Sequence, residues 1–134
     1  MRIIGVTGGV GSGKSEVLNY IQKHFDARVV RADEVGHMLM MPGRACYEPV
    51  ISLFGEWVVN EDTSINRTMI GDIVFENPEL LKKLDDIIHP EVKKYIKKEI
   101  EVSRKEETEF FFIEAAILLE EKYDEICDEV WYIY

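Results

Sequence analysis

Residues 2–15 read Arg-Ile-Ile-Gly-Val-Thr-Gly-Gly-Val-Gly-Ser-Gly-Lys-Ser, an apolar run that leads into a glycine-rich segment. The apolar, β-branched residues 2–7 predict a buried strand, and residues 14–25 predict a helix with one apolar face. Residues 8–15 satisfy G-x-x-x-x-G-K-[ST] between that strand and that helix, which is the context the motif requires. The sequence therefore predicts a loop that binds phosphate.

The residue types of this loop suit the binding of a nucleoside triphosphate. Glycines allow backbone angles that turn successive N–H groups inward, and the N-terminus of the following helix favours phosphate oxygens as well. Lys14 is expected to reach the β- and γ-phosphates, and Ser15 to hold Mg²⁺ through its hydroxyl. The predicted nucleotide contacts are Gly8, Gly9, Val10, Gly11, Ser12, Gly13, Lys14, Ser15 and the adjacent Glu16.

Two other nucleotide-binding motifs fit less well. No G-x-G-x-x-G register fits residues 5–15, which argues against a dinucleotide site. Residues 33–36, Asp-Glu-Val-Gly, match the D-x-x-G of GTPases but lie close behind Ser15. No N-K-x-D follows to bind guanine, and the nearest approach, Glu-Lys-Tyr-Asp at residues 121–124, lacks the Asn. ATP is therefore the expected nucleotide.

Composition limits the partners and the location. The chain has 134 residues and a formal net charge of −10, whereas nucleic acids and anionic membranes are bound by surplus Lys and Arg. Neither partner is expected, and phosphate must be captured by local N–H groups and a few placed cations. Cys46 and Cys127 form no C-x-x-C pattern, and we find no signal peptide and no apolar run of membrane-spanning length. A cytoplasmic location is expected, whereas the sequence indicates no oligomeric state.

The remaining pattern predicts further strands and a helical block. Three short apolar strands are expected at residues 28–31, 110–113 and 129–134. Helices are expected at residues 34–40, 47–54, 68–75 and 78–88, and in a long segment that begins at Pro90.

This order of elements predicts an α/β, P-loop NTPase three-layer fold with a parallel sheet. We expect a single domain with a core of residues 1–33 and 108–134 and a helical insertion at about residues 34–107. The last strand, at residues 129–134, has no covering helix after it, although parallel strands are covered on both faces. A C-terminal portion is therefore expected to be missing from this chain.

Acidic residues follow two of the predicted strands. Asp33 lies at the carboxyl end of the second strand, where open parallel sheets bind ligands, so it could accept a proton from an acceptor hydroxyl. Capping of a helix that begins at Glu34 is an equally good interpretation of Asp33. Glu114 could orient Mg²⁺ or its water shell, but a strand-ending acid without such a role is the simpler interpretation.

Histidines and arginines offer weaker signals. His24, His37 and His89 lack metal-ligand spacing, so no zinc site is expected. His89 precedes Pro90 and is expected at a helix entry, with a substrate contact as the less favoured interpretation. Arg44 and Arg67 are the arginines best placed to meet an anionic substrate.

The order of landmarks along the whole chain resembles that of the dephospho-coenzyme A (dephospho-CoA) kinases, P-loop kinases related to nucleoside monophosphate kinases. The phosphate loop alone is shared by many families, whereas its combination with the central landmarks is much more specific. The matching residues are 4–15, Ala32-Asp33, Pro42-Gly43, Phe54-Gly55, Asn66-Arg67, Val74-Phe75, His89-Pro90, 113–120, Asp128 and Val130.

The resemblance implies transfer of the ATP γ-phosphoryl group, with Mg²⁺, to the ribose 3′-hydroxyl of dephospho-CoA, which is the last step of coenzyme A synthesis. It implies that Asp33 is the base that orients the acceptor hydroxyl and that Lys14 is the second catalytic residue. It also implies that the helical insertion forms the acceptor site, with Arg67 and His89 near dephospho-CoA. A kinase for another nucleoside or nucleotide, and a non-catalytic ATP-binding module, are the alternatives.

The chain departs from the family pattern at several points. Arg31 stands where the family commonly has Asp, Ala116 replaces a frequent proline, and Glu114 is not a general family feature. The family also continues past the last strand into a lid with arginines and a final strand and helix. Because lid arginines neutralise the transferred phosphoryl group, this chain alone is expected to bind ATP weakly and turn over slowly, if at all.

Overall fold

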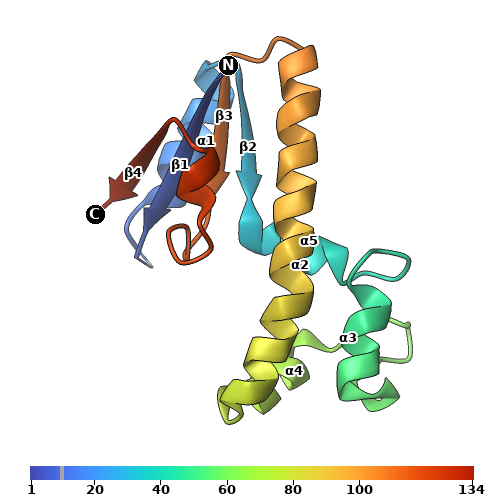
Figure 1. Cartoon of the computed structure of the whole chain (residues 1–134). Helices are drawn as coiled ribbons and strands as arrows, with labels where there is room; N and C mark the ends of the chain where they lie inside the picture. Colours follow the sequence, from blue (N-terminus) through green and yellow to red (C-terminus); the bar gives the residue numbers. More distant parts are fainter. Residues whose placement is uncertain (10) are drawn as a thin grey trace. The chain divides into compact units, whose positions relative to one another are not determined.

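The computed structural model describes residues 1–9 and 11–134 of the chain. The elements run in chain order from a first strand, a helix and a second strand, through a series of helices, to two further strands (Figure 1). They are β1 (Arg2–Gly8), α1 (Lys14–His24), β2 (Ala27–Arg31), α2 (Ala32–Leu39), α3 (Tyr47–Phe54), η1 (Glu56–Val58), α4 (Arg67–Phe75), α5 (Pro78–Lys105), β3 (Phe110–Glu114), η2 (Tyr123–Ile126) and β4 (Glu129–Ile133).

The four strands form one parallel sheet with the order β2-β3-β1-β4. This arrangement confirms the predicted α/β class. β3 lies between β2 and β1, with Phe112 in register with Ile4 on one side and Val29 on the other. The carboxyl ends of all four strands therefore meet at one edge of the sheet, where β1 leads into the glycine-rich loop.

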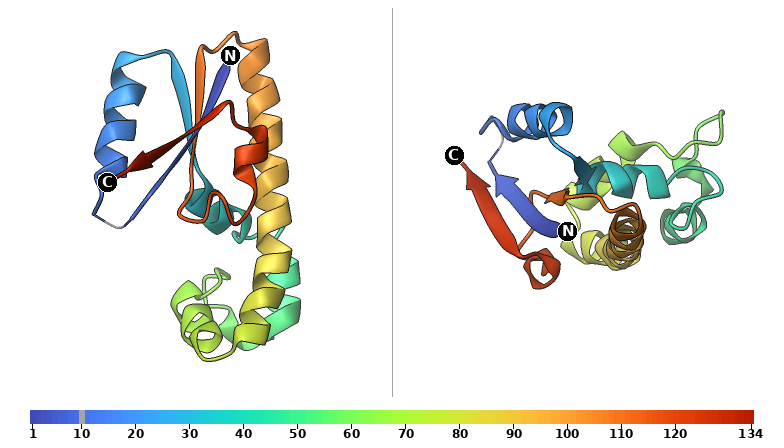
Figure 2. Two further views of the ribbon diagram at one scale, coloured as in Figure 1. Left: turned by 60° about the vertical axis from the view of Figure 1, so that its left-hand side comes forward. Right: turned by 90° about the horizontal axis from the view of Figure 1, so that it is seen from above.

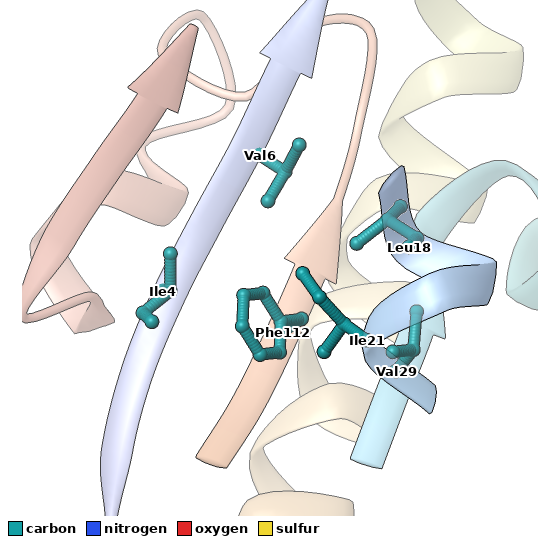
Figure 3. Packing of buried hydrophobic residues seen from close by; sticks show 6 residues of the cluster. All are labelled: Ile4, Val6, Leu18, Ile21, Val29 and Phe112. Carbon is teal, nitrogen blue, oxygen red and sulfur yellow. The ribbon is translucent and has the colours of Figure 1, made fainter. Parts of the chain in front are cut away.

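The first face of the sheet is covered by α1 (Figure 2). Because side chains alternate across a strand, Ile4, Val6, Phe112 and Val29 lie on the same face of three strands. Figure 3 shows these side chains packed against the apolar stripe of α1. That stripe consists of Leu18, which is fully buried, and Ile21.

The opposite face of the sheet carries the side chains of the alternate residues in each strand. Phe111 and Ile113 of β3 are fully buried there. Gly5 of β1 leaves room for Leu118 and Cys127, because a Cβ at Gly5 would lie 2.9 Å from a Leu118 methyl group and 3.0 Å from the Cys127 sulfur. The segment between β3 and β4, which includes η2, therefore packs directly onto β1 (Figure 2).

The chain divides into two compact units. The first consists of Met1–Asp33 and Lys93–Tyr134 and holds the sheet, whereas the second is Glu34–Val92. The second unit has a small core of its own, in which Cys46, Val50 and Val58 are fully buried. The assignment of residues 34–107 to a helical insertion within one kinase domain remains a prediction.

Two predicted helix starts are wrong. The structure has one continuous helix, α5, with Pro90 in its interior, in place of two helices that meet at His89. Pro90 lacks only one backbone N–H, and the helix continues because its apolar residues Val92, Ile96 and Ile100 are buried. The second difference is that α2 begins at Ala32, before Asp33.

Candidate nucleotide-binding site

The glycine-rich loop joins the end of β1 to the start of α1. Gly13 is the N-cap of α1, with φ 89°, a left-handed conformation that an L side chain rarely adopts. Glycine has no side chain to cap the helix, so the N–H groups of the first turn can donate hydrogen bonds to phosphate oxygens. The Ser12 N–H donates to the Gly9 carbonyl at 3.2 Å. Val10, also predicted to contact nucleotide, lies outside the described residues.

Two details of this loop suit a phosphate group. The Ser12 hydroxyl is buried and has no hydrogen-bond partner among the described residues, although buried hydroxyls are normally paired. A Cβ at Gly8 would lie 2.4 Å from the Ile133 carbonyl oxygen, so only glycine fits between β1 and β4 here. The loop therefore starts at Gly8, which is packed against β4, and it holds the Ser12 hydroxyl, which has no partner among the described residues.

Lys14, the first residue of α1, forms an ion pair with Glu114 at the end of β3. The Lys14 Nζ lies 3.0 Å from the Glu114 Oε1, and the two side chains are 16% and 14% exposed. Glu114 follows Phe112 by two positions and therefore lies on the α1 face of the sheet. Glu114 thus pairs with the lysine of the phosphate loop, whereas a role for it in orienting Mg²⁺ stays a prediction.

Arg31 is the last residue of β2, the strand that pairs with β3. It is in register with Glu114 and follows Val29 of the same face by two positions. Its Nη2 donates to the Asn19 Oδ1 of α1 at 3.0 Å. On this face, therefore, β2 and β3 each carry apolar side chains followed by a charged one, Arg31 or Glu114, at the carboxyl end of the strand.

Asp33 is exposed and lies in the first turn of α2. Because the helix begins one residue earlier, Asp33 is not its N-cap, which removes the capping interpretation. Its carboxylate lies close enough to Tyr123 to contribute to the raised pKa of that phenol, about 12, which arises mainly from burial and then from Glu121 and Asp33. The structure thus places Asp33 in the first unit, close to the carboxyl edge of the sheet where β2 ends.

Ser15 and Glu16 are exposed in the first turn of α1, beside Lys14. No group of three or more acidic, His or Cys side chains that could hold a metal ion occurs in residues 1–9 and 11–134. The assignment of Mg²⁺ to the Ser15 hydroxyl stays a prediction.

The two residues predicted to bind the acceptor lie in the second unit. Arg67 is exposed at the start of α4 and lines a hollow of about 400 Å³ with three methionines. His89 lies within α5, where its Nε2 is 3.6 Å from the Asp85 Oδ1, and it is not among the residues that line this hollow. The remaining lining residues are His37, Met38, Met40, Met41, Pro42, Ser64 and Ile65.

The first strand of the parallel sheet runs into a G-x-x-x-x-G-K-[ST] loop, and the loop lysine lies at the N-terminus of the next helix. This combination defines a P-loop nucleotide-binding protein. The family model described as dephospho-CoA kinase matches residues 2–134. The chain belongs to the dephospho-CoA kinase family.

Individual relatives agree with this assignment. A dephospho-CoA kinase of Carboxydothermus hydrogenoformans is 37% identical over 132 residues, which cover 98% of this chain and 64% of the relative. A solved structure from Thermus thermophilus matches with a TM-score of 0.80 and 28% identity over 98% of this chain and 64% of its own. The structure of dephospho-CoA kinase from Campylobacter jejuni matches with a TM-score of 0.76 and 25% identity over 97% of this chain and 66% of its own. The chain thus spans slightly less than two thirds of the length of these relatives.

None of the helices in the described part of the chain is both long enough and apolar enough to cross a membrane. Cys46 and Cys127 both carry free thiols. Burial and the nearby Asp124 and Asp128 raise the pKa of the Cys127 thiol to about 11. Neither cysteine takes part in the phosphate loop.

Proposed function

We propose that the protein to which this chain belongs transfers the γ-phosphoryl group of ATP to the ribose 3′-hydroxyl of dephospho-CoA. Family membership supports this activity, and the observation that carries it is the position of Lys14 at the N-terminus of α1, directly after the glycine-rich loop. Lys14 and Asp33 belong to the same compact unit, the one that holds the sheet.

In this proposal the loop binds the phosphates through backbone N–H groups and the Ser12 hydroxyl, which has no protein partner among the described residues. Lys14 exchanges the carboxylate of Glu114 for β- and γ-phosphate oxygens when the nucleotide binds. The Ser15 hydroxyl would hold Mg²⁺, which would supply further charge neutralisation when bound. Glu114 then faces the phosphate end of the site with its carboxylate released.

Asp33 acts on the acceptor in this proposal. Its carboxylate is exposed, so a hydroxyl group can approach it, and it lies close to the edge of the sheet at which the loop lies. A carboxylate in that place accepts the hydroxyl proton and holds the oxygen in line with the γ-phosphorus. Proton transfer of this kind contributes typically 10²–10⁴-fold to a rate.

The second unit supplies the acceptor site in this proposal. Arg67 stands at the N-terminus of α4, where the helix dipole already favours an anion, and it borders a hollow lined mainly by apolar side chains. Dephospho-CoA combines anionic phosphates with a long, weakly polar arm, and such a site suits both. His89 is the second proposed acceptor contact. We also propose a cytoplasmic location, which the two free thiols support.

The direct test is incubation of the protein with ATP, Mg²⁺ and dephospho-CoA, with detection of the 3′-phosphorylated product by mass spectrometry. Lys14→Met is expected to abolish both ATP binding and transfer. Asp33→Asn is expected to lower transfer at least a hundredfold while ATP affinity stays within about twofold. Asp86→Asn, which removes an exposed carboxylate on α5, serves as the matched control. Full transfer by Asp33→Asn would refute the role of Asp33 as base.

Acceptor competition separates the related activities. Dephospho-CoA, adenosine and AMP are supplied together, and preferential phosphorylation of adenosine or AMP would assign the protein to another nucleoside or nucleotide kinase. Because the chain spans about two thirds of the length of its relatives, phosphoryl transfer and ATP binding by this chain are measured separately. ATP binding that depends on Lys14, without product from any acceptor, would identify a non-catalytic nucleotide-binding module.

A further inference from the structure

The contact between Arg31 and Asn19 brings a cation to the phosphate end of the site. The Arg31 Nη2 donates to the Asn19 Oδ1 at 3.0 Å. Asn19 lies four residues after Ser15 on α1, so the two share one face of the helix, one turn apart. The guanidinium is therefore anchored one helical turn from Ser15, the proposed ligand of Mg²⁺.

The charges at this edge explain why a second cation matters. Lys14 is paired with Glu114, and Asp33 adds another carboxylate to the same edge of the sheet. The chain as a whole has a net charge of −10, which repels a nucleotide. Arg31 is bonded to a neutral amide, so this contact leaves its charge uncompensated.

Chemistry and exposure also suit a phosphate contact. A guanidinium has five N–H donors in a planar fork, and the bond to Asn19 uses one of them. Arg31 is partly exposed, at the end of a strand whose preceding residues Val29 and Val30 are buried. Its head group is therefore held by the packed strand and by Asn19, while further donors remain for phosphate oxygens.

We propose that Arg31 contacts the terminal phosphate oxygens of the bound nucleotide and that Asn19 is the positioning residue for its guanidinium. The inference rests on the proposed function, because it requires nucleotide in the loop at residues 8–15. It makes Arg31 a determinant of how strongly the site prefers a triphosphate over shorter phosphate chains.

Calorimetric titration of the wild-type chain and its variants with ATP, ADP and AMP tests this inference. Arg31→Gln is expected to weaken ATP binding about tenfold, the loss of one charge-assisted hydrogen bond, and to leave AMP binding unchanged. Arg31→Lys keeps the charge without the fork and should lose about threefold for ATP. Asn19→Ala should weaken ATP selectively, by about threefold, because the guanidinium then loses its anchor.

Arg28→Gln is the matched control. It removes the same charge from the same strand, at the opposite end, where Arg28 pairs with Glu99 at 3.5 Å. The control should leave the affinity for all three nucleotides within twofold, and circular dichroism establishes that each variant is folded. If Arg31→Gln does not fold, Arg31→Lys and Asn19→Ala carry the test, and both must weaken ATP more than AMP.

The outcome separates this inference from the proposed function. Suppose that ATP binding depends on Lys14, but that the Arg31 variants bind ATP as the wild type does or lose ATP and AMP affinity equally. This result overturns the role of Arg31 and leaves the proposed function intact. Absence of Lys14-dependent ATP binding in the wild-type chain overturns both. Selective loss of ATP affinity in the Arg31 and Asn19 variants, with the Arg28 control unchanged, supports the inference.

Discussion

The Lys14–Glu114 ion pair predicts opposite effects of one substitution on stability and on nucleotide affinity. Glu114→Gln keeps the size of the side chain and removes its charge. Without nucleotide, Lys14 loses its ionic partner, so the fold should be less stable. With nucleotide, Lys14 no longer has to leave a carboxylate, and the negative charge of Glu114 no longer faces the phosphates. The same substitution should therefore strengthen the binding of Mg²⁺-free ATP.

The geometry sets the size of the effect. Two charges 3.0 Å apart attract by roughly 5–6 kcal/mol at an effective dielectric constant of about 20. Most of this attraction is offset by desolvation of both groups, and removal of one partner from a fully buried pair costs about 3–5 kcal/mol. Since Lys14 and Glu114 are 16% and 14% exposed and glutamine can still accept a hydrogen bond, we expect a loss of about 1–2 kcal/mol in unfolding free energy. The corresponding gain in ATP affinity is about tenfold.

Urea denaturation measures the first quantity, and calorimetric titration of ATP in the presence of EDTA measures the second. A double-mutant cycle with Lys14→Met isolates the coupling between the two side chains. Asp86→Asn is the control, because it breaks an ion pair with Lys82 whose side chains are 77% and 66% exposed. An exposed pair of this kind should contribute little to stability.

Two results would contradict this prediction. One is weaker binding of Mg²⁺-free ATP by Glu114→Gln, and the other is a coupling to Lys14 that is no larger than that of the exposed control pair. Either result would mean that Glu114 does not hold Lys14 in the nucleotide-free protein.

Three further predictions follow from packing and titration. Gly8→Ala should abolish ATP binding and lower the melting temperature, because its Cβ would lie 2.4 Å from the Ile133 carbonyl oxygen; a variant with wild-type affinity would contradict this steric argument. Leu18→Ala should cost about 2–5 kcal/mol in urea denaturation, since Leu18 is fully buried under the sheet, and a loss below 1 kcal/mol would show that the core can collapse around it. Stability should fall as the pH rises from about 9 to 12, because the Cys127 thiol and the Tyr123 phenol, with pKa raised to about 11 and about 12, stay protonated in the folded chain while the unfolded chain ionises. Cys127→Ser should reduce this alkaline loss in a series of melting curves, and an identical pH dependence in that variant would refute the contribution of Cys127.

The sequence predicts the α/β class well because local signals agree with the fold. The apolar run before the loop, the glycines within it and the amphipathic helix after it all indicate one strand–loop–helix unit, and the structure has that unit. The error at Pro90 has a specific cause. Proline is common at the first position of a helix, but the apolar residues before and after Pro90 share the helical period, and their burial outweighs one lost backbone hydrogen bond.

The contacts of the site are harder to predict from the sequence, because they depend on strand order. Glu114 and Arg31 lie far apart along the chain and become neighbours only because β3 lies beside β2. A signal was present in each strand, where a charged residue follows an apolar one by two positions on the same face. The sequence alone does not say that these faces adjoin, nor that the Lys14 side chain reaches Glu114.

The strand order also determines when the phosphate loop can form during folding. Both neighbours of β1 are late segments of the chain, since Arg2 pairs with Phe110 of β3 and Ile4 with Glu129 of β4. β2, the other early strand, does not pair with β1 in this sheet, because β2 lies beyond β3. We therefore expect the glycine-rich loop, although it is synthesised early, to become ordered only after the chain closes a long non-local contact. We expect nucleotide binding to appear only when the whole sheet has formed, and not when the first strand and helix alone have formed.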